Sequence, residues 1–265
     1  MPYSRAFSTL GCPEFTIDEA MALADRHGLE SVEVRALGGT IDLPAHFAAA
    51  HGSPAALAAR LRGARVRIVS LDTSLHLIGV TEAERAKLLE FLPWAEALGV
   101  RWLRAFDGGK TADAAELAEA AATVRWWRDL RRDHGWQADL MVETHDAFTS
   151  AAAIRRLLEA APGTAILWDA FNTWLRSGED PVATWRAIGR EVVHVHVKDA
   201  IRRPSGRHPF TYVLPGTGEF PMAPLAAELR AGFAGAVSLE WEKLWHPYLA
   251  PLEDALVSAA ERGWW

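Results

Sequence analysis

Short apolar and β-branched runs alternate with longer amphipathic stretches along the whole chain. The short runs predict strands and the longer stretches predict helices, because apolar residues repeat with different periods in the two structures. Regular alternation of strand and helix favours a parallel sheet. The predicted strands span residues 6–10, 31–35, 66–71, 100–106, 139–143, 165–169, 192–199 and 236–240.

Several predicted helices carry local start and stop signals. Thr16 and Glu19 form a capping pattern before the first helix, and Gly28 and Gly99 follow helix ends. Pro93 predicts a break or a restart within its helix. The assigned helices span residues 16–27, 54–63, 81–98, 112–134, 150–160, 221–231 and 252–262. The alternation is counted as eight strands and eight helices, of which seven helices are given a range.

This count predicts an α/β protein with a single (β/α)8 TIM barrel domain over residues 1–265. Such barrels typically contain about 250 residues. A doubly wound open sheet is the alternative. The barrel is favoured because polar residues cluster at the C-terminal ends of many strands, where barrel active sites lie.

Composition narrows the possible partners and location. The formal net charge of −6 disfavours a surface built for nucleic acid, and no apolar run is long enough to span a membrane. The N-terminus does not resemble a secretory signal. The single cysteine, Cys12, cannot form an intramolecular disulfide, so a cytoplasmic location is expected.

The seventh predicted strand has two different faces. His194, His196 and Lys198 alternate with valines, so the three polar side chains project to one side. An exposed edge strand would show the same alternation, with its polar face in water. The strand alone does not decide between a solvent-exposed face and a functional one.

Four consecutive strands each place an acid or a histidine near their C-terminal ends: Glu143, Asp169, His196 and Glu240. In a barrel these side chains converge near the mouth. Three carboxylates and one imidazole suit a divalent ion such as Mn²⁺, Mg²⁺ or Co²⁺. Solvated loop charges or helix caps are the alternative for any single acid, but a shared site better explains four successive strands.

The order of several motifs resembles the xylose-isomerase-like barrel superfamily, and in particular its sugar phosphate isomerase/epimerase branch. The resemblance spans nearly the whole chain. It rests on Glu143-Thr144-His145, Trp168-Asp169, His194-Val195-His196-Val197-Lys198-Asp199, Gly216-Thr217-Gly218-Glu219 and Leu239-Glu240-Trp241-Glu242.

The resemblance implies that Glu143, Asp169, His196 and Glu240 are metal ligands. Mn²⁺ is the favoured ion, with Mg²⁺, Co²⁺ or Zn²⁺ as alternatives, and no other cofactor is expected. The family often has histidine three residues after the aspartate, where this chain has Asn172. Asparagine can hydrogen-bond a substrate oxygen but cannot act as a base.

These residues predict a sugar, sugar phosphate or polyol-ketone isomerase or epimerase. A metal that chelates a hydroxyl and a neighbouring carbonyl stabilises the enediolate formed by proton removal. Glu143 and Glu240 are the predicted catalytic base and acid, as in related ketose epimerases. Proton return to the other face epimerises the substrate, and return to the adjacent carbon isomerises it.

Further side chains are predicted to contact the substrate, and His194 is predicted to be a hydrogen-bonded supporting residue. Asp199 is a candidate cap for the following loop. The arginines of that loop, Arg202, Arg203 and Arg207, are candidates to bind a phosphate or carboxylate. The predicted substrate contacts are His145, Asn172, Lys198, Arg104, Glu33 and Trp241.

Three other functions remain open from the sequence. A lyase of the same barrel family would remove the same proton and then lose a β-hydroxyl, as with an inosose or dehydroshikimate, or cleave a C–C bond. An endonuclease acting at abasic DNA shares this barrel but uses a richer zinc cluster, and the acidic charge argues against it. A noncatalytic sugar-binding module is the last option. The expected partner is a small carbohydrate, with a homo-oligomer as a possible assembly.

Overall fold

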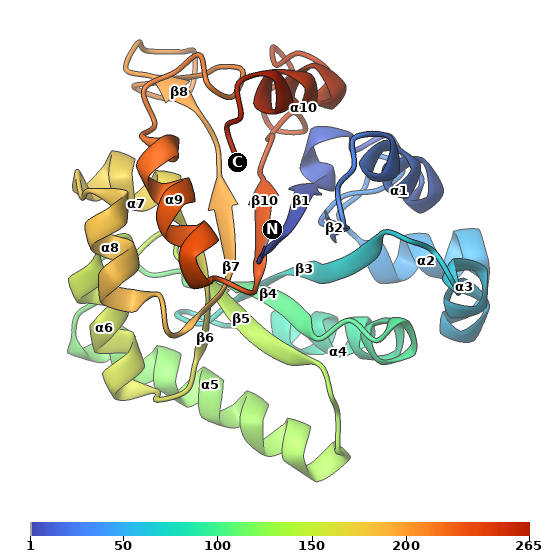
Figure 1. Cartoon of the computed structure of the whole chain (residues 1–265). Helices are drawn as coiled ribbons and strands as arrows, with labels where there is room; N and C mark the ends of the chain where they lie inside the picture. The colour runs from blue at the N-terminus through green and yellow to red at the C-terminus, as the bar shows by residue number, and fades with distance from the viewer. Residues whose placement is uncertain (1) are drawn as a thin grey trace.

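Eight parallel strands close into a barrel in this computed structural model, which describes residues 2–265 (Figure 1). Each strand pairs with its neighbours in chain order, and the last closes on the first. This confirms the predicted (β/α)8 TIM barrel and excludes the open sheet. The barrel strands are β1 (Ser4–Ser8), β2 (Ser31–Val34), β3 (Arg67–His76), β4 (Trp102–Phe106), β5 (Asp139–Glu143), β6 (Ala165–Asp169), β7 (Val192–Val197) and β10 (Ala236–Leu239).

Helices surround the barrel (Figure 1). The predicted helices are all present, with ends that differ by a few residues at most. Pro93 lies inside a continuous helix, so the predicted break there is wrong. The helices are η1 (Thr9–Gly11), α1 (Ile17–Arg26), α2 (Leu43–His51), α3 (Pro54–Leu61), α4 (Glu82–Leu98), α5 (Ala114–His134), α6 (Ala151–Ala160), α7 (Ala170–Ser177), α8 (Pro181–Ile188), α9 (Met222–Gly232) and α10 (Leu252–Glu261).

Three α-helices, and the short 3-10 helix η1, have no counterpart among the assigned ranges. Helix α2 is rich in alanine and apolar around much of its circumference, so it lacks an amphipathic period. Helix α7 begins immediately after β6, with the Asp169 side chain as its N-cap. Helix α8 follows after a short connection. Two helices therefore occupy the segment between β6 and β7.

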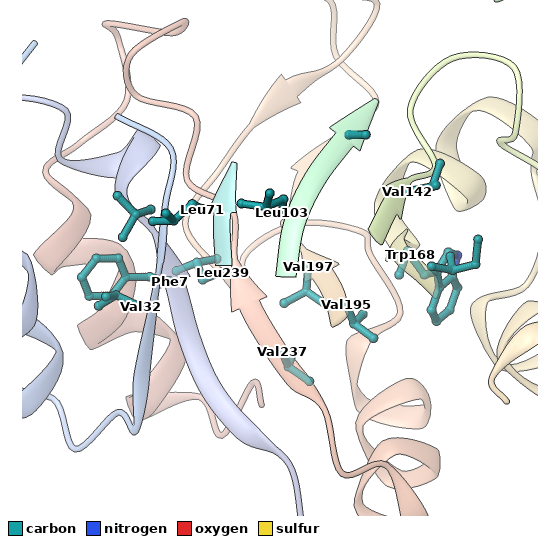
Figure 2. Packing of buried hydrophobic residues seen from close by; sticks show 14 of the residues in the cluster. Phe7, Val32, Leu71, Leu103, Val142, Trp168, Val195, Val197, Val237 and Leu239 are labelled. Atoms are coloured by element: carbon teal, nitrogen blue, oxygen red, sulfur yellow. The ribbon is translucent and has the colours of Figure 1, made fainter. Parts of the chain in front are cut away.

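The outward faces of the strands form the main apolar core. Val195 and Val197 of β7 are fully buried, as are Phe7 of β1 and Trp168 of β6 (Figure 2). Strand β7 pairs with β6 on one side and β10 on the other, so it is not an exposed edge. Its valines therefore pack outward while its histidines face the barrel interior.

A small antiparallel hairpin follows β7, where the sequence indicated a long loop. It consists of β8 (Ala200–Ile201) and β9 (Thr211–Tyr212). Asp199 anchors its base: Oδ1 accepts the N–H groups of Ala200 and Phe220, and Oδ2 accepts those of Gly216 and Gly218, at 2.9 to 3.1 Å. Strand β8 lies beyond the C-terminal end of β7 (Figure 1).

No helix among residues 2–265 combines the length and apolar character needed to cross a membrane.

Candidate functional site

The four strand-end residues predicted as metal ligands meet inside the barrel mouth. Glu143, Asp169, His196 and Glu240 each contribute one potential ligand atom, and these atoms all lie within 4.8 Å of one another. All four residues are buried. The parallel strands bring them together because each side chain faces inward at the same end of the barrel.

Hydrogen bonding orients His196. Its Nε2 lies 2.7 Å from Oε2 of Glu33, which comes from β2 and is fully buried. The opposite nitrogen, Nδ1, lies 3.5 Å from Glu143 Oε1 and 3.3 Å from Glu240 Oε2. With Glu33 ionised, Nε2 carries a proton, and Nδ1 is the ring nitrogen that faces the carboxylates.

Several buried atoms of this cluster lack a hydrogen-bond partner among the described residues. They are Nδ1 of His196 and Oε2 of Glu143; Oδ2 of Asp169 also makes no hydrogen bond, but it forms an ion pair with the Lys198 ammonium at 2.9 Å. Unpaired polar atoms are costly to bury, and neighbouring carboxylates repel one another. A divalent cation resolves both problems by accepting the lone pairs. Three carboxylates and one imidazole therefore fit such an ion, and this donor set suits Mn²⁺ and Zn²⁺ alike.

The pKa values of the residues in the cluster are shifted in different directions. Burial disfavours the charged form of Glu143, but Arg104 and His196 outweigh it and hold the pKa of this carboxyl below its usual range. Burial raises the pKa of Asp169, and Lys198 only partly offsets it. For His196, Glu33 and Glu240 outweigh burial and raise the pKa. The cluster thus holds negative charge that needs compensating cations.

Lys198 connects the cluster to a cavity. Its Nζ lies 2.9 Å from Asp169 Oδ2, contacts Glu240 Oε2 and lies 2.7 Å from Glu242 Oε1. The hydroxyl of Tyr212, on the hairpin, donates to the same Glu242 oxygen at 2.9 Å. The lysine is only 2 % exposed, so its ammonium is held between these carboxylates at the floor of the cavity.

The cavity has a volume of about 550 Å³ and opens next to the carboxylate cluster. Helix α7 and the hairpin supply most of its wall. This volume is within the range of pockets that bind small molecules. Its lining residues are His145, Asn172, Leu175, Arg176, Lys198, Arg202, His208, Pro209, Phe210, Tyr212 and Glu242.

Two predicted substrate contacts lie in this wall beside Lys198. His145 follows β5, and its Nδ1 lies 3.1 Å from Asp146 Oδ2. Burial opposes its charged form, but Asp146 and Glu143 outweigh it and raise the pKa of His145 to about 9. Asn172 lies in the first turn of α7, and its backbone N–H donates to Asp169 Oδ1 at 2.8 Å.

Three other predicted contacts are not part of the cavity wall. Glu33 lies behind His196 and also approaches His194 Nε2 at 3.0 Å. Arg104 is buried beside Glu143, with Nε 3.3 Å from Oε2. Both residues contact the cluster from within the barrel and do not line the cavity.

Trp241 faces the opposite direction from Glu240. It is 2 % exposed and its indole N–H donates to the carbonyl of Ala250 at 2.9 Å. Gly11 packs against its Cβ. Adjacent residues of an extended strand project to opposite sides, so an inward Glu240 requires an outward Trp241. The expectation that Trp241 contacts substrate is therefore corrected: it is a core residue.

His194 has the supporting position predicted for it. Its Nε2 lies 2.6 Å from the Ser238 hydroxyl, one layer below His196. Among the other cavity residues, Arg202 was already a candidate from the sequence, whereas Arg176, Tyr212 and Glu242 were given no role there. Glu242 shares the parity of Glu240, and Arg176 lies one helical turn beyond Asn172, so both spacings were available as signals. Tyr212 and Glu242 are far apart along the chain, so no local pattern in the sequence indicated that they are in contact.

The fold and the buried cluster at the C-terminal mouth define a TIM barrel with a carboxylate–histidine centre. The chain belongs to the xylose isomerase-like TIM barrel family, whose model matches residues 21–263. Among curated proteins, none matches the sequence.

Solved structures share the fold at low sequence identity. A probable 3-DHS dehydratase, AsbF, from Bacillus anthracis is 17 % identical, with a TM-score of 0.79 and 97 % of each chain covered. IolI protein, solved with a bound zinc atom, is 18 % identical, with a TM-score of 0.73 and coverage of 98 % of this chain and 96 % of its own. A D-tagatose 3-epimerase-like protein is 14 % identical, with a TM-score of 0.68 and coverage of 97 % and 95 %.

Proposed function

We propose that this protein is a divalent-metal-dependent isomerase or epimerase of a small sugar, sugar phosphate or polyol-derived ketone. The observation that carries the proposal is the placement of Glu143 and Glu240. Both carboxylates approach Nδ1 of His196, at 3.5 and 3.3 Å, from strands on either side of β6 and β7. Two carboxylates that flank one centre can remove a proton on one side of a substrate and deliver one on the other.

We propose Glu143, Asp169, His196 and Glu240 as the ligands, with Mn²⁺ favoured and Mg²⁺, Co²⁺ or Zn²⁺ as alternatives. When bound, the ion would supply Lewis acidity that polarises a substrate carbonyl and makes the neighbouring C–H acidic. The zinc bound to IolI supports an ion in a barrel of this kind.

The residues of this chain then divide the proton transfer between them. One glutamate takes the proton from the carbon beside the carbonyl, and the other returns a proton to the opposite face or to the adjacent carbon. Arg104, in contact with Glu143, favours the charged state that a base requires. Lys198 and Asn172 line the cavity and can donate hydrogen bonds to substrate oxygens.

A lyase is the second candidate, and Lys198 is the observation that favours it. A buried ammonium group at the cavity floor can donate a hydrogen bond to a departing β-hydroxyl, and the glutamate that took the C–H proton can return it to that oxygen so that water leaves. The similarity to a probable 3-DHS dehydratase is compatible with this outcome. Product mass separates the two reactions, because an isomer keeps the substrate mass and a dehydrated product loses one water.

We also propose that the binding partner of this protein is a small carbohydrate. A cytoplasmic location is proposed as well, because the buried free thiol of Cys12 stays reduced there. A nucleic-acid substrate is not proposed. A multi-zinc nuclease centre needs several histidines, whereas His196 is the one histidine in the four-residue cluster.

Solvent exchange tests the proposed function. Protein loaded with Mn²⁺ is incubated in D₂O with a panel of ketoses, ketose phosphates and inososes, and deuterium at the carbon beside the carbonyl is measured by mass spectrometry. The expected result is incorporation into at least one substrate, reduced about 10²- to 10⁴-fold in Glu143→Gln. Glu159→Gln, an exposed change on α6, serves as control. Absence of exchange across the panel would overturn the proposal.

A further inference from the structure

We propose that Arg176 and Arg202 form an anion-binding subsite at the outer part of the cavity, which selects substrates carrying a carboxylate or phosphate group. This proposal rests on the proposed function, because it assigns a substrate class to the same cavity. Arg176 comes from α7 and Arg202 from the end of β8, so the two guanidinium groups approach the cavity from different elements.

Neither arginine is closely neutralised by the protein. The nearest carboxylate oxygens among residues 2–265 lie 3.9 Å away for both, from Asp146 for Arg176 and from Glu219 for Arg202. By contrast, Arg60 pairs with Asp18 at 2.8 Å on the surface. The N–H donors of Arg176 and Arg202 therefore remain available for a ligand.

Stacking fixes the position of one of these groups. The guanidinium carbon of Arg202 lies 4.9 Å from the centre of the Trp174 ring. Trp174 lies in α7, the helix that also carries Arg176. A guanidinium held over a ring loses less freedom on binding an oxyanion than a free side chain does.

The base of the hairpin is also fixed beside Arg202. The Arg202 N–H donates to Glu219 Oε1 at 2.9 Å, and Asp199 anchors the preceding residues. This backbone is therefore set before any ligand binds, and the arginine projects from a constrained base rather than from a free loop.

The other arginines of the same loop have different surroundings. Arg207 donates from Nη1 to the carbonyl of Trp245 at 2.7 Å, and Arg203 is exposed outside the cavity wall. Of the three arginines in this loop, only Arg202 lines the cavity. The second arginine in the cavity wall is Arg176, which lies in α7.

The charge along the cavity is consistent with a substrate bound at both ends. At the inner end, Lys198 is already in contact with Asp169, Glu240 and Glu242. At the outer end, the two arginines provide positive charge with only long ion pairs. A substrate with its ketone end at the carboxylate cluster and an anionic group at the other end matches this distribution.

Anion binding without turnover tests the subsite. The Mn²⁺-loaded protein is titrated with sodium acetate and, separately, with inorganic phosphate, by calorimetry at constant low ionic strength. At least one anion is expected to bind in the millimolar range, and Arg176→Ala and Arg202→Ala should each weaken it by about tenfold. Arg203→Ala is the matched control and should bind like the unchanged protein.

The stronger of the two anions identifies the group as carboxylate or phosphate. The subsite is overturned if neither anion binds, or if both arginine variants bind as well as Arg203→Ala does. Its failure is distinguishable from that of the proposed function. Anion binding without C–H exchange would leave the subsite intact, whereas exchange of a neutral ketose without anion binding would leave only the proton-transfer function.

Discussion

Oε2 of Glu33 lies 2.7 Å from Nε2 of His196, which joins β2 to β7 across the barrel interior. The carboxylate approaches the ring from the side opposite Nδ1, which faces Glu143 and Glu240. This contact fixes the rotation of the ring and its tautomer. Glu33 is therefore a positioning residue for the proposed ligand.

Replacing Glu33 by Gln should weaken metal binding without removing a ligand. Loss of a carboxylate that orients a ligating histidine typically costs about 10- to 100-fold in metal affinity. Competitive titration against a chromogenic chelator measures the change. Glu159→Gln, on the exposed face of α6, is the control, and equal affinities for the two variants would contradict a positioning role.

Metal removal should lower thermal stability. The buried carboxylates of Glu143, Asp169 and Glu240 lie close together, and a bound cation stabilises the folded chain by an amount that grows with the logarithm of the free ion concentration relative to Kd. Free Mn²⁺ or Zn²⁺ at 100 times its Kd contributes about 2.7 kcal/mol, which raises Tm by about 5–10 °C for a domain of this size. Differential scanning calorimetry with and without a chelator measures this difference in Tm.

Two variants make the stability test specific. His196→Ala removes the imidazole from the cluster and should abolish most of the metal-dependent rise in Tm. His134→Ala, an exposed change at the end of α5, should retain it. A rise that is equally large in His196→Ala would place the stabilising ion elsewhere.

Asp199→Asn should loosen the hairpin that walls the cavity. The carboxylate accepts four backbone N–H groups, two on each oxygen, and the amide of asparagine would turn one acceptor into a donor facing two donors. The N–H groups left without an acceptor should lower the local free energy of unfolding by about 1–3 kcal/mol. Hydrogen exchange of residues 214–220 should accelerate, with Asp133→Asn as an exposed control.

The loop between β4 and α5 gives a prediction for pH. Glu116 accepts the N–H groups of Thr111, Ala112 and Lys110, and Ala112 has a left-handed φ of 50°. The bond from Thr111, with smaller effects from the other two, lowers the pKa of Glu116 against a modest opposing effect of burial.

A lowered pKa in the folded state means that the folded chain binds fewer protons than the unfolded chain in the acid range. The stability contributed by Glu116 is therefore complete above the unfolded pKa of about 4.3 and is lost as pH falls through the folded value. The Tm difference between the unchanged protein and Glu116→Gln should be present at pH 7 and disappear in strong acid. A difference that grew on acidification would contradict this sign.

Local patterns in the sequence were enough to place the strands and the cluster. The bounds of β5 and β6 match their predicted ranges, and the alternation in β7 correctly separated His194 and His196 from Val195 and Val197. These features depend on side-chain parity within one strand, which is readable over a few residues.

Contacts between residues that are far apart in the sequence could not be predicted from local patterns. Glu33 was expected to contact substrate, but its partner His196 is 163 residues away and appears only when the barrel closes. The pairing of Tyr212 with Glu242 is similarly long-range. Trp241 is different, because strand parity with Glu240 already indicated an outward direction.

Asp169 is shared by two parts of the molecule. One oxygen accepts the Asn172 N–H and so caps α7, while the other faces Lys198. A protein engineer who replaced Asp169 to alter ion preference would also disturb the first turn of the helix that carries Asn172 and Arg176. Ion preference and substrate fit are therefore not independent design variables in this barrel, and a change in one would need compensating changes along α7.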